Sequence, residues 1–356
     1  MKRVFNFSAG PSILPVEVLK RAQNELVSYK DTGMSVMEMS HRSKVYQEIF
    51  DKAQSLLRKL MNISDDYEVL FLQGGASSQF AAVPMNFSQG NKCLYVDSGA
   101  FASKAIKEAK RYADVKVVAS GKDSNYNYIP MDFEIDQEAA YLHITSNNTI
   151  FGTSYSTLPD TGDVELVADM SSEICGVKRD VNKFGLIYAG AQKNLGPAGL
   201  TVVIVKKSLL DNPLGITPNM LNYSVLAKGS SMVNTPPTYS IYMAMLNFEY
   251  MLENGGVAGA EKSNVEKANM LYNVLDDSTF FMPVAKKDFR SIMNVTFTLP
   301  NDELTQKFVK DAGAIGLVNI KGHRSVGGIR ASIYNAMPKE GVEKLAQFMV
   351  DFERNN

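Results

Sequence analysis

Apolar runs of about five or six residues recur between residues 68 and 206, and most of them end in a cluster of glycine and small polar residues. Runs of this length, rich in Val, Ile, Leu and Tyr, predict buried strands. With their polar ends they read EVLFLQGGASS, KCLYVDSGAF, AYLHITSNNT, VELVADMSS and LIYAGAQK, and LTVVIV follows. Stretches of helical spacing such as FASKAIKEAKRY separate some of them. This alternation predicts an α/β fold, in which helices cover both faces of a mainly parallel sheet.

Helical spacing of apolar residues predicts helices outside this region as well. Pro15 is suited to open a helix over residues 16–30. Its apolar positions are Val18, Leu19, Ala22, Leu26 and Tyr29. We expect a second helix over residues 44–61 and a long one over residues 257–275.

The last hundred residues have a different order of elements. They read as strand SIMNVTFTL, helix DELTQKFVKDAG, strand GGIRASIYN and helix PKEGVEKLAQFMVDFER. A chain of 356 residues is also too long for one compact core. We therefore predict a large domain over residues 16–257 and a smaller α+β domain over residues 258–356, which the N-terminal arm of residues 1–15 joins.

The polar ends of the strands predict one site. In open α/β sheets, ligands bind at the carboxyl ends of the strands. The clusters QGGASS, DSGAF, TSNNT, ADMSS and AGAQK all follow predicted strands. We expect them to meet at the same edge of the sheet.

One of these clusters places a lysine on a turn. The segment LIYAGAQKNLGPAGLTVVIV predicts a strand, a tight turn of small residues and a second strand, with Lys193 at the start of the turn. Burial lowers the pKa of a lysine, and a neutral amine can attack a carbonyl to form a Schiff base. From this segment alone, a surface lysine in a loop is an equally good interpretation.

Asp169 ends the predicted strand before Lys193, where a buried carboxylate is costly without a cationic partner. A pyridinium nitrogen would be such a partner. The alternative is a helix cap, for which Ser171 and Ser172 compete. Upstream, the turn Gly74–Ser78 leads from a strand into a helix N-terminus, which suits a phosphate. It matches neither of the two common nucleotide-binding glycine motifs.

Two histidines are followed directly by arginine. These pairs are His41-Arg42 and His323-Arg324, and Arg330 follows the second pair. Arginine forks suit carboxylates and phosphates, so the set indicates a doubly anionic substrate. Ordinary surface arginines are the alternative for either pair. His143, on an apolar strand, is interpreted as a core histidine.

Composition narrows the class of protein further. Lys and Arg number 37 against 38 Asp and Glu, which argues against a general nucleic-acid or membrane-surface binder. The two cysteines, Cys93 and Cys175, lack metal-ligand spacing and predict reduced thiols. We find neither a secretory leader in MKRVFNFSAGPS nor an apolar run near the roughly 20 residues that span a bilayer. We therefore expect a cytoplasmic enzyme.

Six motifs together resemble a known family. They are FNFSAGPS, SVMEMSHRS, QGGASSQFAAVPMN, IYAGAQKNLGPAGLT, NTPPTYSIY and KGHRSVGGIRASIYNAMP, in this order over nearly the whole chain. The chain thereby resembles the phosphoserine aminotransferases, of the class V group of pyridoxal-phosphate enzymes. The resemblance implies the aminotransferase fold of type I, with a mainly parallel seven-stranded sheet in the cofactor-binding domain. It also implies pyridoxal 5'-phosphate as cofactor and a homodimer with shared active sites.

The resemblance implies roles for individual residues. Lys193 would hold the cofactor covalently and move a proton at the substrate α-carbon, Asp169 would pair with the pyridine nitrogen, and Phe101 would stack on the ring. Further cofactor contacts would be Ala76, Ser77, Thr149 and Gln192, with Asn234 and Thr235 from the second subunit. Substrate contacts would be Ser8, His41, Arg42, His323, Arg324 and Arg330. Among these, Arg330 would hold the α-carboxylate, and the two His-Arg pairs the distal anion.

The implied reaction is reversible transfer of the amino group of glutamate to 3-phosphohydroxypyruvate, which gives O-phospho-L-serine and 2-oxoglutarate in L-serine biosynthesis. The resemblance extends this to the phosphorylated hydroxythreonine intermediate of pyridoxine biosynthesis. Two positions depart from the pattern, because many bacterial members carry arginine in place of Ser77 and tryptophan in place of Phe101. Phenylalanine can still stack, but one anchor for the substrate phosphate is missing.

Three alternatives stay open. A cysteine desulfurase needs a mobile nucleophilic cysteine, which neither Cys93 nor Cys175 fits well. An alanine–glyoxylate aminotransferase needs fewer anion-binding groups. A non-catalytic regulator on the same fold need not retain the proton-transfer lysine.

Overall fold

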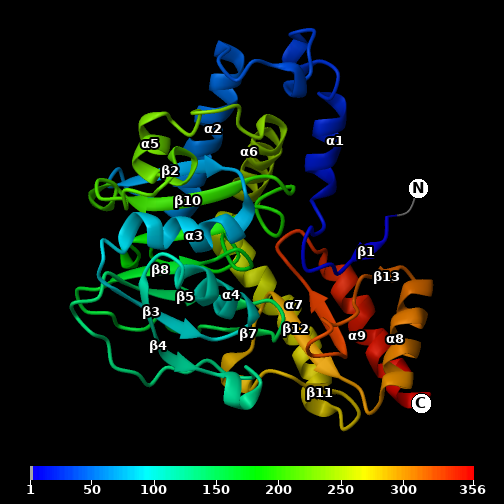
Figure 1. The fold of residues 1–356 in the computed structure, drawn as a ribbon. Helices are drawn as coiled ribbons and strands as arrows, with labels where there is room; N and C mark the ends of the chain where they lie inside the picture. The colour runs from blue at the N-terminus through cyan, green and yellow to red at the C-terminus, as the bar shows by residue number, and fades with distance from the viewer. Residues whose placement is uncertain (1–2) are drawn as a thin grey trace.

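A seven-stranded sheet forms the centre of the computed structural model, which describes residues 3–356 (Figure 1). The strand order is β2-β10-β9-β8-β5-β3-β4. Only β10 runs antiparallel to its neighbours in this sheet. The strands of this sheet are β2 (Tyr67–Leu72), β3 (Lys92–Asp97), β4 (Asp114–Ser120), β5 (Tyr141–Thr145), β8 (Glu165–Asp169), β9 (Leu186–Gly190) and β10 (Thr201–Lys206). The predicted α/β class with a mainly parallel sheet is confirmed.

Helices bury both faces of the sheet, which explains why its strands are continuously apolar. Along β2, Val69 and Phe71 pack into one core with α2 (Lys44–Met61) and α6 (Thr238–Glu253). Leu70 and Leu72 point to the other face, which α3 (Gly75–Phe87), α4 (Ala100–Ala109) and α5 (Tyr223–Lys228) cover. No helix among residues 3–356 is long and apolar enough to cross a membrane.

The last third of the chain builds a second core. Its sheet has the order β11 (Met282–Pro283), β12 (Asn294–Thr298) and β14 (Ile329–Ser332), covered by α8 (Asp302–Ala314) and α9 (Lys339–Arg354). The long helix α7 (Gly256–Asp277) places its start in the first core and its later turns in the second. A short hairpin, β6 (Asn147–Asn148) and β7 (Thr153–Ser154), follows β5.

The N-terminal arm packs into this second core. Strand β1 (Phe5–Asn6) pairs in parallel with β13 (Leu317–Val318), so the blue start of the chain lies beside the orange segment in Figure 1. Phe7 and Ile13 are buried with the residues of α7, α8 and α9. The grouping of the arm with residues 258–356 and the boundary near residue 257 stay predictions.

One predicted helix is shorter than its pattern indicated. Helix α1 (Val16–Asn24) ends well before residue 30, and a separate turn of 3-10 helix spans Tyr29–Asp31. Lys30 and Asp31 have φ angles of 44° and 59°, in the left-handed region. Tyr29 is buried because it packs edge-on against Tyr242 of α6, with 5.7 Å between ring centroids. Its apolar spacing therefore reflects a tertiary contact and not a helix.

Candidate active site

The polar ends of the strands meet in one cavity of about 340 Å³ at the carboxyl edge of the sheet. Each of the five predicted clusters contributes at least one lining residue, and the second core and the N-terminal arm close the other side. The lining includes Ala9, Gly10, Gly75, Ala76, Ser77, Phe101, Lys104, Thr145, Asn147, Thr149, Asp169, Ser171, Ser172, Gln192, Lys193, His323 and Arg330.

Lys193 lines this cavity and is buried, with 9% of its surface exposed. Its Nζ donates a hydrogen bond to Oγ1 of Thr149 at 2.9 Å and lies 5.6 Å from the centroid of the Phe101 ring. Burial lowers the pKa of the Lys193 amine to about 8, although the charge of Asp169 opposes this effect. A neutral, nucleophilic amine is therefore accessible near physiological pH.

Two segments distant in the sequence donate hydrogen bonds to the backbone around Lys193. Ser12 of the N-terminal arm donates its hydroxyl to the carbonyl of Lys193 at 2.5 Å. Asn247 of α6 donates to the carbonyl of Asn194 at 2.9 Å. Gly10 lies so close that an added Cβ would stand 3.4 Å from Cγ of Lys193. The tight turn between β9 and β10 therefore presents the lysine in a fixed orientation.

Asp169 is buried at the end of β8, with 5% of its surface exposed. Its Oδ1 accepts a hydrogen bond from the backbone N–H of Ser171 at 2.9 Å, and residues 171–176 form turns, so the carboxylate caps no α-helix. Burial raises the pKa of Asp169, while Ser171 and the charge of Lys193 oppose that shift. Asp169 makes no ion pair with any residue between 3 and 356. The site thus contains a buried carboxylate that lacks a close cation.

The turn after β2 offers backbone donors to the same cavity. Helix α3 begins at Gly75, and its N-cap residue, Gly74, has a φ angle of 93° and provides no side-chain cap. The first turn carries no acidic residue, and Gly75, Ala76 and Ser77 line the cavity. The N-terminus of a 13-residue helix with free N–H groups is a suitable place for an anion.

Basic residues from the second core also line the cavity. Arg330 on β14 has a buried Nε that finds no hydrogen-bond partner within residues 3–356. The ring of His323 bonds to Oγ of Ser325 through Nδ1 at 2.7 Å. Burial lowers the pKa of His323, and the charges of Arg330, Arg324 and Lys104 lower it further. Asp169 is the only acidic residue in the described lining, so this wall can accept anions.

Six of the predicted site residues do not line the cavity of their own chain. These are Ser8, His41, Arg42, Arg324, Asn234 and Thr235. Arg42 is exposed just before α2, while the neighbouring His41 has a buried Nε2 without a partner in the described chain. Asn234 and Thr235 are exposed before α6, where the Thr235 carbonyl accepts from Nε2 of Gln73 at 2.7 Å. Their roles remain predictions.

The structure adds lining residues to which the sequence analysis gave no role in the site. Thr145, Asn147, Ser171 and Ser172 belong to the polar clusters after β5 and β8, so the position of each cluster was the available signal. Lys104 follows Phe101 by one helical turn on α4, a spacing that places both side chains on one face. Ala9 and Gly10 reach the site only through the folding of the arm, which no local pattern indicates.

His143 lies behind the site and is almost fully buried, as interpreted. Its Nε2 bonds to the hydroxyl of Tyr188 at 2.9 Å, whereas Nδ1 has no side-chain partner within residues 3–356. Burial lowers the pKa of His143 to about 3, so the ring is neutral.

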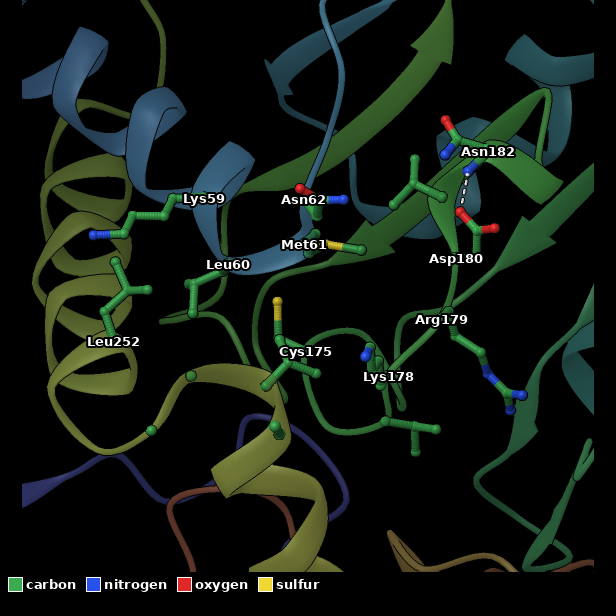
Figure 2. Close-up of a pocket in the computed structure, with 16 residues that line it drawn as sticks. Lys59, Leu60, Met61, Asn62, Cys175, Lys178, Arg179, Asp180, Asn182 and Leu252 are labelled. Carbon is green, nitrogen blue, oxygen red and sulfur yellow. Dashed lines mark hydrogen bonds between the residues drawn. The ribbon is translucent and has the colours of Figure 1, made fainter.

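A larger cavity of about 600 Å³ lies elsewhere, between the end of α2, the loop after β8 and the start of α7 (Figure 2). None of the predicted site residues lines it, whereas Cys175 does. Arg179 on its wall donates Nε to Glu173 at 2.7 Å and NH2 to the carbonyl of Tyr155 at 2.6 Å. The Arg179 side chain points away from Cys175 in Figure 2. Its charge is thus already paired.

The chain is similar to known proteins over a range that includes every residue lining the Lys193 cavity. The family model described as aminotransferase class-V matches residues 4–345. The phosphoserine aminotransferase of Listeria monocytogenes serotype 4b (strain F2365) is 54% identical, over 99% of this chain and 97% of its own length. The solved phosphoserine aminotransferase from Bacillus circulans subsp. alkalophilus superposes with a TM-score of 0.97 at 49% identity, over 100% of this chain and 99% of its own. A PLP-bound phosphoserine aminotransferase from Trichomonas vaginalis has a TM-score of 0.94 at 37% identity, over 98% of this chain and 100% of its own.

Proposed function

The chain belongs to the phosphoserine aminotransferases of the class-V aminotransferase family, and on this basis we propose that it transfers the amino group of glutamate to 3-phosphohydroxypyruvate. The products are O-phospho-L-serine and 2-oxoglutarate, and the reaction is reversible. We extend the proposal to the phosphorylated hydroxythreonine intermediate of pyridoxine biosynthesis. The observation that carries the proposal is the Lys193 cavity, in which a buried amine faces one carboxylate and several cations.

The residues of this cavity fit pyridoxal 5'-phosphate. The uncapped start of α3 suits the phosphate, the Phe101 ring suits a flat partner, and the buried Asp169 suits a protonated ring nitrogen. A cation beside Asp169 would lower its pKa again and keep it charged. Cofactor contacts are thus proposed for Ala76, Ser77, Phe101, Thr149, Asp169, Gln192 and Lys193.

The chemistry of the chain itself centres on Lys193. When bound, the cofactor supplies a carbonyl that accepts the amino group and a ring that stabilises negative charge on the substrate α-carbon. Nζ of Lys193 holds and moves the proton that leaves this carbon. A pKa of about 8 suits that task, because general acid–base catalysis is most effective near the working pH. The hydrogen bond to Thr149 orients Nζ.

Two kinds of anion must be held while the proton moves. The guanidinium of Arg330, whose buried Nε lacks a partner in residues 3–356, is proposed to bind the α-carboxylate. His323 is proposed to bind the distal anion, which is a carboxylate in glutamate and a phosphate in the acceptor. Both side chains come from the second core, so residues of the two cores together surround the reacting atoms.

A homodimer completes the proposal. His41, Arg42, Asn234 and Thr235 lie outside the Lys193 cavity of their own chain, which supports their contribution to the site of a second subunit. Mixing Lys193→Ala and Arg42→Ala proteins tests this directly, because hybrid dimers with shared sites contain one intact site. Return of activity on mixing is expected, and two inactive variants that stay inactive after subunit exchange would contradict sharing. We also place the enzyme in the cytoplasm, where its proposed pathway would operate.

The central experiment is a glutamate-dependent assay with 3-phosphohydroxypyruvate, compared with unphosphorylated hydroxypyruvate. Arg42→Ala and Arg324→Ala should lose rate with the phosphorylated acceptor and change little with the unphosphorylated one. The exposed Arg111, which pairs with Glu108 on the surface, provides a matched control as Arg111→Ala. Failure of the unaltered protein to form O-phosphoserine would overturn the proposed function.

The same assay separates the rivals. An alanine–glyoxylate aminotransferase would prefer acceptors without phosphate. A desulfurase would release sulfur from cysteine, but burial raises the pKa of Cys175 to about 12 and that of Cys93 to about 11, so neither thiol is a ready nucleophile. A regulator would bind the cofactor and transfer no amino group.

A further inference from the structure

Lys104 is a basic residue that lines the Lys193 cavity and has no role in the proposed function. It lies on α4, one turn after Phe101, and lines the cavity together with His323 and Arg330. Its Nζ makes no hydrogen bond and no ion pair with any residue from 3 to 356. Its charge is therefore free to meet an incoming anion.

The side-chain amines of Lys104 and Lys193 both lie near the ring of Phe101. Nζ of Lys104 lies 5.1 Å from the Phe101 centroid, and Nζ of Lys193 lies 5.6 Å from the same centroid. An amine above a ring is attracted to it, which holds the flexible lysine chain over the cavity. Both amines thus lie within 6 Å of the Phe101 centroid, close to where a ring stacked on Phe101 would lie.

Lys104 also belongs to the basic wall of the cavity, which it forms together with His323 and Arg330. Its charge reaches His323, since it is among the groups that depress the pKa of that ring. Asp169, at the end of β8, is the only acid among the described residues that line the cavity. A substrate whose α-carbon is at Lys193 and whose second anion is three bonds away would point that anion toward this wall.

We propose that Lys104 binds the distal anion of the substrate and thereby helps to select phosphorylated acceptors. This inference rests on the proposed function, because it assigns a contact for that substrate. A phosphate carries nearly two charges at neutral pH and a carboxylate one, so the contribution of Lys104 is larger for the phosphorylated partner than for glutamate.

The test compares substitutions on one helix in the cofactor-loaded enzyme. Lys104→Ala is expected to raise KM for 3-phosphohydroxypyruvate about 3- to 30-fold, because a partly exposed charge contact is weaker than a buried one. KM for hydroxypyruvate and kcat should change little, Lys104→Arg should restore KM, and Lys104→Glu should raise it further. Lys107→Ala is the matched control, since Lys107 is exposed one turn later and does not line the cavity.

Two results would overturn the role. One is an unchanged KM in Lys104→Ala. The other is a loss of cofactor affinity, or a change in cofactor absorption, with equal effects on both acceptors, because Lys104 would then act only by supporting the Phe101 ring.

A binding experiment keeps this inference separate from the proposed function. Calorimetry would titrate O-phospho-L-serine into cofactor-loaded wild type, Lys104→Ala and Lys107→Ala. If wild type transfers no amino group, the proposed function fails, yet weaker binding by Lys104→Ala alone still supports the contact. Equal affinity in all three proteins overturns the contact, and no binding to wild type overturns both ideas.

Discussion

The Lys193 cavity and the cavity in Figure 2 differ in whether their arginines are paired. The larger one, in Figure 2, has Arg179 bound to Glu173 and to a carbonyl. In the smaller one, neither Arg330 nor Lys104 makes an ion pair with any described residue. Charges that the chain leaves unpaired are costly unless a ligand meets them. The exposed Lys59 and Lys178 of the larger cavity are also unpaired among the described residues, but water solvates them. A guanidinium with a buried, partnerless Nε, and not volume, thus marks the functional cavity.

Burial also has opposite chemical consequences in the two cavities. It lowers the pKa of the Lys193 amine to about 8 and raises the pKa of the Cys175 thiol to about 12. Both shifts favour the neutral form. A neutral amine is a nucleophile and a base, whereas a neutral thiol is a poor nucleophile. The same desolvation therefore makes the Lys193 amine more reactive as a nucleophile and the Cys175 thiol less reactive.

The largest expected effect is at Lys193. Lys193→Ala should lower the rate of amino transfer about 10²- to 10⁴-fold, because it removes the group that moves the proton. Lys59→Ala and Lys178→Ala, which change exposed lysines of the larger cavity, should leave the rate unchanged. The steady-state rate with glutamate and 3-phosphohydroxypyruvate measures this. A wild-type rate in Lys193→Ala would refute the contrast.

Arg179→Ala should change stability instead of catalysis. Its side chain is 10% exposed and that of Glu173 is 1% exposed, so the substitution leaves a buried carboxylate unpaired. The free energy of unfolding should fall by about 3–5 kcal/mol, while kcat of the folded enzyme is retained. Urea unfolding measures this change, with Lys178→Ala as the exposed neighbouring control. A loss below about 1 kcal/mol would show that the pair is not what stabilises this loop.

Arg330→Ala should show the reverse pattern. Loss of the contact to the α-carboxylate should lower kcat/KM by the equivalent of about 2–5 kcal/mol for both substrates. Stability should stay nearly unchanged, because no acid in the described chain depends on Arg330. Arg330→Lys, which keeps the charge but not the fork, should lie between the two. Kinetics and urea unfolding of the same preparations decide the matter, and a purely structural defect would count against the assignment.

The smallest expected effect is a pH dependence of stability without cofactor. The pKa of Lys193 is about 8 in the fold against 10.5 for a free lysine, so the unfolded chain binds more protons between these values. Stability of the wild type should therefore rise with pH across this interval relative to Lys193→Met. At pH 7 the variant should be more stable by about 1–3 kcal/mol, and the gap should close above pH 10.5. Lys178→Met controls for the loss of a lysine, and a gap that ignores pH would contradict the shifted pKa.

Features with local causes could be predicted from the sequence. Helix α2 runs over Lys44–Met61 as its spacing predicts, because Ser43 caps its start and Asn62 takes a left-handed conformation at its end. The strand, turn and strand around Lys193 also follow from local composition. The meeting of the polar clusters follows from one general property of parallel sheets.

Features with long-range causes could not. Lys267 is fully buried on α7, where its Nζ donates to the carbonyls of Ile333, Tyr334 and Met337, and burial lowers its pKa to about 7. No helical pattern predicts a lysine on a buried face, because its partners lie about seventy residues away. Likewise, one chain cannot reveal which residues serve a neighbouring subunit.

The contacts of the N-terminal arm with the Lys193 turn and with β13 bear on the order in which the chain folds during synthesis. The arm reaches its place by pairing with β13, and Asn6 accepts a hydrogen bond from Asn319, 313 residues later in the chain. At roughly 5–20 residues per second, a ribosome needs about 15 to 60 s to make the intervening segment. Residues 5 and 6 therefore wait for their partners on β13 while the intervening segment is made, and until then this strand pairing does not hold the arm beside the lysine turn.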